Sequence, residues 1–216
     1  MKVEIWSDVM CPFCYIGKRK FENALKQFSH KADVEVVWKS FQLDPTLKTD
    51  AKTTVNQMLA DKKGWSMEYA KEMNDHVSRI AKEVGLTYNL NEAVVANSFD
   101  AHRFSHLAKK YNLQNQAEER LFSAYFTEGK NTADKNTIIQ LGNEVGLNGE
   151  LIKQMLESNE YAEDVKNDIR EAQQVGVKGV PFFLINDKYT ISGAQDSSMF
   201  LGALNQIWDE FEKDKQ

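Results

Sequence analysis

Between residues 53 and 176 the chain contains no proline and no clear alternation of apolar and polar side chains. Proline interrupts helices and a two-residue alternation marks strands, so this stretch is predicted to be helical throughout. The individual helices are expected over residues 66–84, 91–111, 115–128, 134–145 and 160–175. All β-structure must then come from the two ends of the chain, and this constrains the fold more than any other feature.

The N-terminal end has the pattern of a strand, a helix and a second strand. Residues 3–6 and residues 34–41 are mostly β-branched or aromatic, as expected of strands. Between them, apolar residues recur every three or four positions over residues 21–28, which indicates an amphipathic helix beginning near Pro12. This order predicts a parallel βαβ unit.

The C-terminal end returns to β-structure after the last helix of the middle segment. Residues 181–185 and 189–191 flank a turn, which predicts a hairpin. An amphipathic helix follows, with Asp196 or Ser197 as its candidate N-cap.

Neither β-containing end can bury its apolar faces alone, so the simplest packing joins them in one sheet. The predicted fold class is α/β, with an N-terminal βαβ part and a C-terminal αββα part. The α/β domain is discontinuous and comprises residues 1–46 and 164–216. Residues 47–163 form a large α-helical insertion between its two parts.

Composition and charge argue against several functions. Lys and Arg total 27 against 32 Asp and Glu, a formal net charge of -5, which disfavours nucleic acids and anionic membranes as partners. No apolar run approaches the roughly 20 residues of a membrane span, and the start MKVEIWSDVM lacks the features of a signal peptide. Glycine-rich nucleotide motifs are absent from the sequence. A cytoplasmic monomer or homodimer without a metal or nucleotide cofactor is expected.

The chain has 2 cysteines, and both lie in Cys11-Pro12-Phe13-Cys14, between the first predicted strand and helix. The unpaired N–H groups and positive dipole end of that helix favour a thiolate at Cys11. Cys14, one turn on, is close enough to attack a mixed disulfide formed at Cys11. A bridge across two residues constrains little of the unfolded chain, so a purely structural disulfide would stabilise little. A redox-active pair is predicted.

The cysteine pair has two alternative roles that stay open. The pair could form half of a zinc site, which His102 and His106, four residues apart on a predicted helix, would complete. Their distance along the chain is unlike that of a zinc finger, so a zinc site is disfavoured. The two thiols could also be an incidental pair without chemistry.

A second signal is Val180-Pro181, directly before the predicted hairpin. A proline at this place is commonly an ordinary trans residue at a strand edge. With a Cys-x-x-Cys upstream, a cis bond would turn the Val180 backbone toward Cys11, where an extended substrate could pair with it. The predicted catalytic residues are Cys11 and Cys14. The predicted substrate-binding residues are Pro12, Phe13, Val180 and Pro181.

Six separated motifs occur along the chain: DVMCPFCYIGK at 8–18, FQLDP at 41–45, AHR at 101–103, F-x-x-YF at 122–126, GVP-x-F at 179–183 and SGAQ at 192–195. Together they resemble the FrnE branch of the DsbA-like thioredoxin superfamily, over nearly the whole chain. The resemblance implies a thioredoxin-like fold with a helical insertion and protein disulfide oxidoreductase or isomerase activity. It also implies Cys11 as the attacking thiol, Cys14 as the resolving thiol and Pro181 in cis.

The same superfamily includes 2-hydroxychromene-2-carboxylate isomerases and kappa-class glutathione transferases, which generally carry Ser where Cys11 stands. Serine holds the glutathione sulfur through a hydrogen bond, whereas Cys11 would form a mixed disulfide with it. This departure favours redox exchange with protein or small-molecule thiols and disulfides, with glutathione as a candidate co-substrate. A glutathione-dependent isomerase or transferase is the alternative. A noncatalytic redox sensor or partner-binding protein is a third hypothesis.

The sequence departs from periplasmic DsbA in its Pro-Phe dipeptide, where DsbA has Pro-His. The histidine stabilises a thiolate electrostatically. Without it, we expect a couple less oxidising than the about -120 mV of DsbA.

Two acidic residues near the cysteines are candidate supporting residues. Asp8 could take part in proton transfer, although an Asp before a helix is commonly a turn or capping residue. Glu4 could be a buried carboxylate that takes the proton of Cys14, or its side chain could simply reach solvent at the end of the sheet.

Four residues outside the N-terminal segment complete the candidates. His102 and Arg103 could line the active-site groove, although an inter-helix hydrogen bond is the commoner role. Asp196 and Ser197 match the region that holds the γ-glutamyl end of glutathione in relatives, but they are equally good helix caps. The aromatic residues within 122–126 are expected in the core. The insertion as a whole should cover one side of the active site and restrict which disulfides enter.

Overall fold

A computed structural model describes residues 1–213 of the chain. Its main sheet has the strand order β2-β1-β5-β6. The strands are β1 (Lys2–Ser7), β2 (Glu35–Ser40), β5 (Phe182–Ile185) and β6 (Tyr189–Ser192). β2 runs parallel to β1, whereas β5 runs antiparallel to both β1 and β6. The two ends of the chain therefore share one sheet, as predicted.

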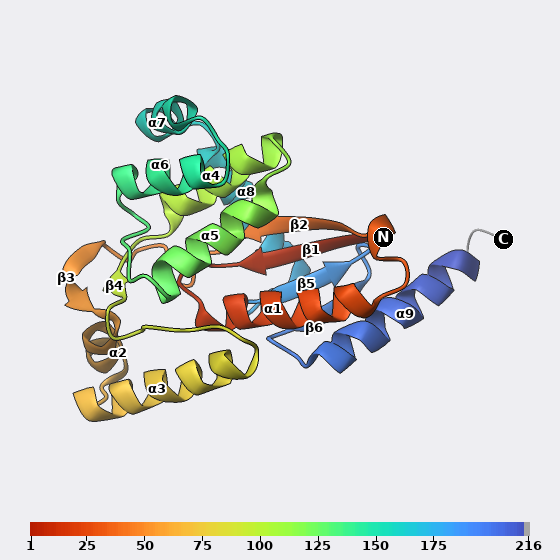
Figure 1. The fold of residues 1–216 in the computed structure, drawn as a ribbon, viewed down its shortest axis with the longest axis horizontal. Coiled ribbons are helices and arrows are strands. Elements are labelled where there is room, and N and C mark those ends of the chain that lie inside the picture. Colours follow the sequence, from red (N-terminus) through yellow and green to blue (C-terminus); the bar gives the residue numbers. More distant parts are fainter. Residues whose placement is uncertain (214–216) are drawn as a thin grey trace.

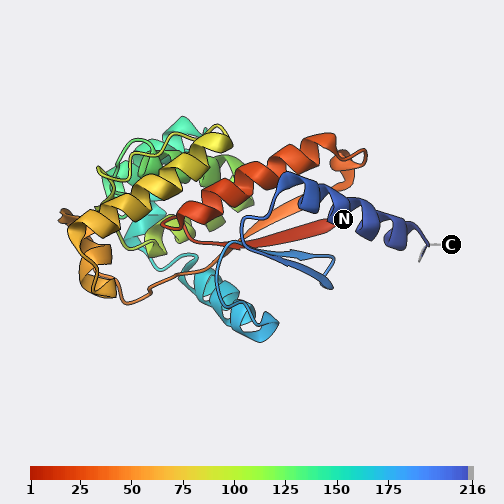
Figure 2. The ribbon, with the colours of Figure 1, turned by 90° about the horizontal axis from the view of Figure 1, so that it is seen from below.

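Helices cover both faces of this sheet (Figure 2). α1 (Pro12–Gln27) and α9 (Ser197–Lys213) lie on one face, and α8 (Ala162–Val175) lies on the other. Successive side chains of β1 point to opposite faces of the sheet. Ile5 therefore packs in the core beneath α1, and Trp6 packs in the smaller cluster beneath α8. The short 3₁₀ helix η1 (Lys31–Asp33) leads from α1 into β2.

The segment between β2 and α8 forms the predicted insertion and lies beside the end of the sheet at which α1 begins (Figure 1). Its helices are α2 (Val55–Lys63), α3 (Met67–Glu83), α4 (Phe99–Lys110), α5 (Gln114–Phe126), α6 (Lys135–Glu144) and α7 (Gly149–Glu157). The predicted domain boundaries at residues 46 and 164 stay predictions, and residues 214–216 lie outside the described part. No helix within residues 1–213 is long and apolar enough to cross a bilayer.

The prediction of a wholly helical middle segment is wrong in two places. β3 (Asp50–Thr54) and β4 (Val94–Val95) form a small antiparallel sheet. Because β4 occupies part of the helix expected over residues 91–111, α4 begins only at Phe99. The side chains of β3 are mostly exposed, so no apolar alternation marks this strand in the sequence.

Two helices were also absent from the prediction, α2 and α7. Each is 9 residues long and begins with a side-chain cap. Thr54 Oγ1 accepts a hydrogen bond from Gln57 N, and Asn148 Oδ1 accepts one from Glu150 N. The caps stabilise the starts of two short helices, of which α2 has a weak apolar face whereas α7 buries Ile152, Met155 and Leu156.

Gly17 lets α1 approach the loop that carries Pro181. A Cβ atom at Gly17 would lie 2.8 Å from Pro181 Cγ and 3.5 Å from the Cβ of Ala194. Glycine is therefore required by packing here, since any side chain would push the helix and the loop apart.

We predict that Gly17→Ala lowers the free energy of unfolding by about 1–3 kcal/mol, the usual cost of overpacking. Gly202→Ala is the matched control, because Gly202 is an exposed residue of α9 whose added Cβ meets nothing within 4 Å. That control should be as stable as the wild type or up to about 1 kcal/mol more stable. Urea unfolding measures both, and equal stability of the two variants would contradict the required close approach at Gly17.

Candidate active site

The cysteine pair lies where β1 passes into α1, as the sequence indicates. Cys11 is the N-cap of α1 and Pro12 is the first helical residue. Cys11 N donates a hydrogen bond to Asp8 O at 2.9 Å, and Cys14 N donates one to Cys11 O at 3.0 Å. The Cys11 side chain therefore stands at the positive end of the helix dipole.

The two thiols are unbridged in this structure and differ in their surroundings. Cys11 is 4% exposed and Cys14 is fully buried. Burial raises the pKa of the Cys14 thiol well above its ordinary value, and the hydrogen bond and charge of Cys11 raise it further. The Ser7 hydroxyl and the Asp8 backbone act in the opposite direction. Cys14 is therefore a protonated thiol near neutral pH, which suits a group that reacts second.

The Val180–Pro181 peptide bond is cis, and the Val180 carbonyl faces Cys11. Cys11 Sγ lies 3.4 Å from Val180 O and donates to it. Gly193 N, at the end of β6, donates to Pro181 O at 2.8 Å and so fixes the loop to the hairpin. The predicted cis proline and the predicted approach of Val180 to Cys11 are both confirmed.

Two apolar side chains near the cysteines are exposed. Phe13, between the cysteines, is 41% exposed, and Leu43 is 52% exposed. The backbone N–H of Leu43 donates to Asp8 Oδ2 at 2.8 Å, which holds the loop after β2 against the turn before Cys11. Leu43 was not among the predicted site residues, because an apolar residue in a loop carries no pattern of its own.

Asp8 serves as a turn residue, which confirms one of its two predicted roles. Its Oδ1 accepts a hydrogen bond from Met10 N at 3.4 Å, in addition to the bond from Leu43. His102 Nε2 from α4 lies 3.5 Å from the same Oδ1, and both side chains are buried. Burial opposes protonation of His102, but Asp8 raises the pKa of the imidazole above its ordinary value. A proton-transfer role for Asp8 stays a prediction.

Glu4 is a buried carboxylate, which confirms one of its two predicted placements, and the alternative that its side chain reaches solvent is wrong. The residue is 3% exposed, and its carboxylate pairs with Lys2 Nζ at 2.8 Å and Lys39 Nζ at 3.5 Å. Lys2 belongs to β1 and Lys39 to β2. Both lysines therefore compensate the negative charge of the Glu4 carboxylate from strands of the same sheet. Transfer of the Cys14 proton to Glu4 stays a prediction.

Arg103 holds α4 to the end of α7, which confirms the predicted inter-helix role. Its guanidinium donates to the carbonyl oxygens of Met155, of Ser158 at 2.7 Å and of Glu160 at 2.9 Å. Asp100 Oδ1 accepts a further bond at 2.8 Å. These contacts occupy the Arg103 donors in the insertion, so the structure does not place this side chain among the groups around Cys11.

His106, the second member of the zinc alternative, faces a different carboxylate from His102. Its Nε2 lies 2.9 Å from Asp168 Oδ2 and 3.1 Å from Ser40 Oγ. Asp168 belongs to α8, on the face of the sheet opposite α1. The two histidines are thus used separately as partners of buried acids.

Asp196 and Ser197 join the start of α9 to α1. Asp196 Oδ1 accepts a hydrogen bond from Lys20 Nζ at 2.8 Å, and its side chain is 81% exposed. Ser197 Oγ donates to Lys20 O at 2.9 Å. A glutathione-binding role for either residue stays a prediction.

The insertion reaches the first turn of α1, as predicted. Tyr88, in the segment after α3, donates from its hydroxyl to Pro12 O at 2.7 Å. Its ring stacks on that of Tyr15, with centroids 6.1 Å apart and planes 18° apart. The predicted core aromatics are buried as well: Phe122, Tyr125 and Phe126.

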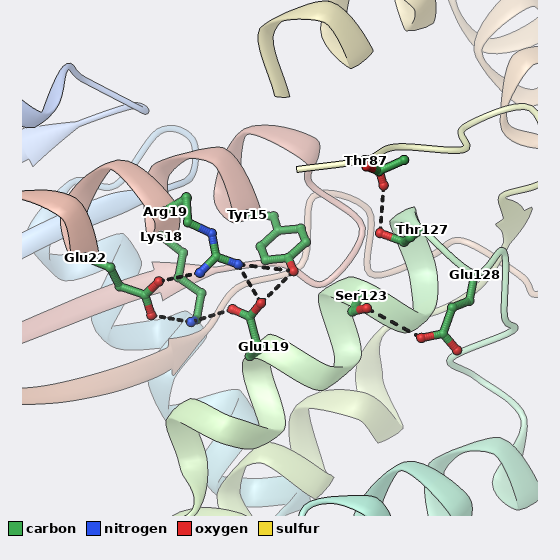
Figure 3. A network of polar contacts seen from close by, with 9 residues as sticks. All are labelled: Tyr15, Lys18, Arg19, Glu22, Thr87, Glu119, Ser123, Thr127 and Glu128. Carbon is green, nitrogen blue, oxygen red and sulfur yellow. Dashed lines mark hydrogen bonds and ion pairs between the residues drawn. The ribbon is translucent and has the colours of Figure 1, made fainter. Parts of the chain in front are cut away.

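A network of charges joins α1 to α5 beside this aromatic stack (Figure 3). Glu119 of α5 accepts hydrogen bonds from Tyr15 at 2.6 Å, Lys18 at 2.7 Å and Arg19 at 2.6 Å. Glu22 of α1 pairs with the same Lys18 and Arg19. Burial opposes ionisation of Glu119, but the Lys18 charge and these hydrogen bonds hold the pKa of its carboxyl below the ordinary value. No sequence pattern indicates this network, because its halves lie far apart in the chain.

Comparison with known proteins identifies the family of this chain. The model of the DSBA-like thioredoxin domain family matches residues 2–205. The uncharacterized protein YwbO of Bacillus subtilis (strain 168) is 30% identical over 205 residues, which cover 94% of this chain and 95% of that protein. The crystal structure of a probable DsbA oxidoreductase from Streptomyces coelicolor is 38% identical, covers 97% of this chain and 91% of that chain, and has a TM-score of 0.92.

A more distant solved structure shares the fold alone. A 2-hydroxychromene-2-carboxylate isomerase is 16% identical, covers 99% of this chain and 98% of that chain, and has a TM-score of 0.70. The predicted thioredoxin-like α/β fold is confirmed, and the chain belongs to the DSBA-like thioredoxin domain family.

Proposed function

We propose that this protein is a thiol–disulfide oxidoreductase or isomerase that exchanges disulfides through Cys11 and Cys14. The observation that carries the proposal is the unequal pair of thiols beside the cis-proline loop. Cys11 caps the helix 3.4 Å from Val180 O, and Cys14 is fully buried one turn behind it. Such a pair provides one thiol for attack and one for resolution.

In the reductive direction, the Cys11 thiolate attacks one sulfur of a substrate disulfide. A bond forms between that sulfur and Cys11 Sγ, and the other substrate sulfur leaves as a thiolate. Cys14 then gives up its proton to the thiolate already released and attacks Cys11 Sγ. This releases the second substrate sulfur as a thiolate, which takes a proton from water. The protein ends with a Cys11–Cys14 disulfide and the substrate gains two electrons; oxidation of a dithiol is the reverse.

The backbone of Val180 offers an acceptor to an extended substrate segment beside Cys11, and Pro181 offers no competing N–H. Pro12 and the exposed Phe13 directly follow Cys11 in the sequence. The proposed partners are therefore protein or small-molecule thiols and disulfides. The proposed compartment is the cytoplasm, where a reducing pool returns the pair to the dithiol.

A second candidate is a glutathione-dependent isomerase or transferase, favoured by the shared fold of the 2-hydroxychromene-2-carboxylate isomerase. In that case glutathione would be a co-substrate held near Cys11. The two functions differ in their need for sulfur at position 11, because disulfide exchange requires a thiolate whereas the isomerase chemistry does not.

We predict that Cys11→Ser abolishes reduction of insulin disulfides, because the variant has no thiolate that can attack. Cys14→Ala should instead accumulate a mixed disulfide at Cys11, because resolution is lost. Mass spectrometry before and after dithiothreitol identifies the bound partner, and Gly202→Ala serves as an active control. A Cys11→Ser variant that isomerises 2-hydroxychromene-2-carboxylate at the wild-type rate would contradict the proposal and favour the second candidate.

The two thiols should react with iodoacetamide at different rates in the folded protein. Cys11 is expected to be alkylated first at pH 8, because burial shields Cys14 and raises its pKa. Peptide mass spectrometry after a short pulse gives the two extents of labelling. In urea the two rates should converge, and equal rates in the folded protein would argue against the division of roles.

The redox couple is predicted to be less oxidising than the about -120 mV of DsbA, since Phe13 provides no charge near the Cys11 thiolate. Equilibration with glutathione buffers measures the potential. Phe13→His should move it toward more oxidising values by stabilising the thiolate. A wild-type potential as oxidising as that of DsbA would contradict this expectation.

A further inference from the structure

The segment between α3 and β4 is fixed across the first turn of the active-site helix. Asn89 N donates to Phe126 O at 2.6 Å, and Thr127 Oγ1 donates to Thr87 O at 2.7 Å (Figure 3). Both contacts attach the backbone next to Tyr88 to the end of α5. The backbone on both sides of Tyr88 is therefore held by the insertion.

The Tyr88 ring is also fixed. It stacks on Tyr15 at 6.1 Å and on Phe126 at 4.7 Å, with planes 18° and 23° apart. Its hydroxyl donates to Pro12 O at 2.7 Å, a short bond in a largely buried place. Because the ring is held by stacking on both neighbours, the Tyr88 hydroxyl is directed at Pro12 O.

The accepting carbonyl belongs to the peptide group between Pro12 and Phe13. The N–H of that group is among the first N–H groups of α1, which have no partner within the helix and point toward the N-cap residue Cys11. A hydrogen bond to the oxygen of an amide polarises the whole group and strengthens its N–H as a donor. Donation by Tyr88 therefore strengthens one of the N–H groups at the positive end of α1, the end at which a Cys11 thiolate would form. In the thiol form none of these groups donates to Cys11 Sγ, which faces Val180 O instead.

The phenol remains a donor while the site works. Burial, and then the negative charge of Cys11, raise the pKa of Tyr88 far above its ordinary value. A thiolate at Cys11 thus makes loss of the phenolic proton harder, so the hydrogen bond to Pro12 O persists when the thiolate forms.

We infer that Tyr88 is a positioning residue by which the insertion controls the reactivity of Cys11 through the Pro12–Phe13 peptide group. This inference rests on the proposed function in one respect, that the Cys11 thiolate is the reacting species. The inference assigns control of that thiolate to a residue of the insertion, which lies outside both the Cys-x-x-Cys motif and the cis-proline loop.

Tyr88→Phe tests the inference, because it removes the hydroxyl and keeps the stacked ring. The rate of Cys11 alkylation by iodoacetamide at pH 7 should fall about 1.3- to fourfold, because polarisation by a neighbouring hydrogen bond supplies only a fraction of the strength of a bond to a charged group. The pH profile of alkylation should move to higher pH, with the same maximal rate once Cys11 is fully ionised. Insulin reduction should slow at pH 7 and recover at higher pH.

Tyr125→Phe is the matched control. Tyr125 is also buried, and its hydroxyl also donates to a backbone carbonyl, that of Val94 at 3.0 Å, within the insertion. This variant loses the same kind of bond without changing the contact to the Pro12–Phe13 peptide group, and it should keep the wild-type pH profile. An unchanged profile in Tyr88→Phe, or an equal displacement in Tyr125→Phe, would overturn the inference.

A milder variant covers the case in which Tyr88→Phe folds poorly. Thr127→Val removes the bond to Thr87 O and loosens the Tyr88 segment, so a smaller displacement in the same direction is expected. No displacement in this variant, in protein with wild-type circular dichroism, counts against the inference. If Cys14→Ala traps no partner while Tyr88→Phe still moves the alkylation profile, the proposed function fails and the role of Tyr88 stands.

Discussion

The antiparallel pairing of β1 with β5 is the contact on which the rest of the site depends. Trp6 stands opposite Phe182. The end of β1 that leads to Cys11 and the start of β5 that follows Pro181 therefore lie side by side at the same end of the sheet. A slip of one residue would exchange the two faces of β5, and the buried Phe183 would leave the core beneath α1. The core therefore fixes the register, and the register sets the approach of Cys11 to Val180.

The insertion contributes more than a cover to this arrangement. Lys18 is 2% exposed, and its ammonium depends on Glu22 of its own helix and on Glu119 of α5. A buried cation needs such partners, so the active-site helix is electrostatically incomplete without α5. The Tyr88 contact lies at the start of the same helix. The two contacts together couple the orientation of α1 to the insertion, one at its first turn beside Cys11 and one further along the helix at Lys18.

The sequence allowed prediction of those parts whose signal is local. The β-branched and aromatic run around Ile5, the helix beginning at Pro12 and the hairpin after Pro181 all follow from neighbouring residues. β3 could not be predicted, because its exposed side chains form no pattern and its partner β4 spans only Val94–Val95. The role of Glu119 could not be predicted either, since charge patterns show which acids exist and not which distant lysine they meet.

The same distinction applies within the candidate site. Cys11 and Cys14 are recognisable by their spacing, and Pro181 becomes so once the cysteine pair is known. Tyr88 has no such signal, because its importance comes from one hydrogen bond to a backbone carbonyl that only the folded chain brings near. In the proposed function, motifs in the two chain ends determine which reaction the site carries out. The inferred role of Tyr88 adds a contact from the insertion that leaves no pattern in the sequence.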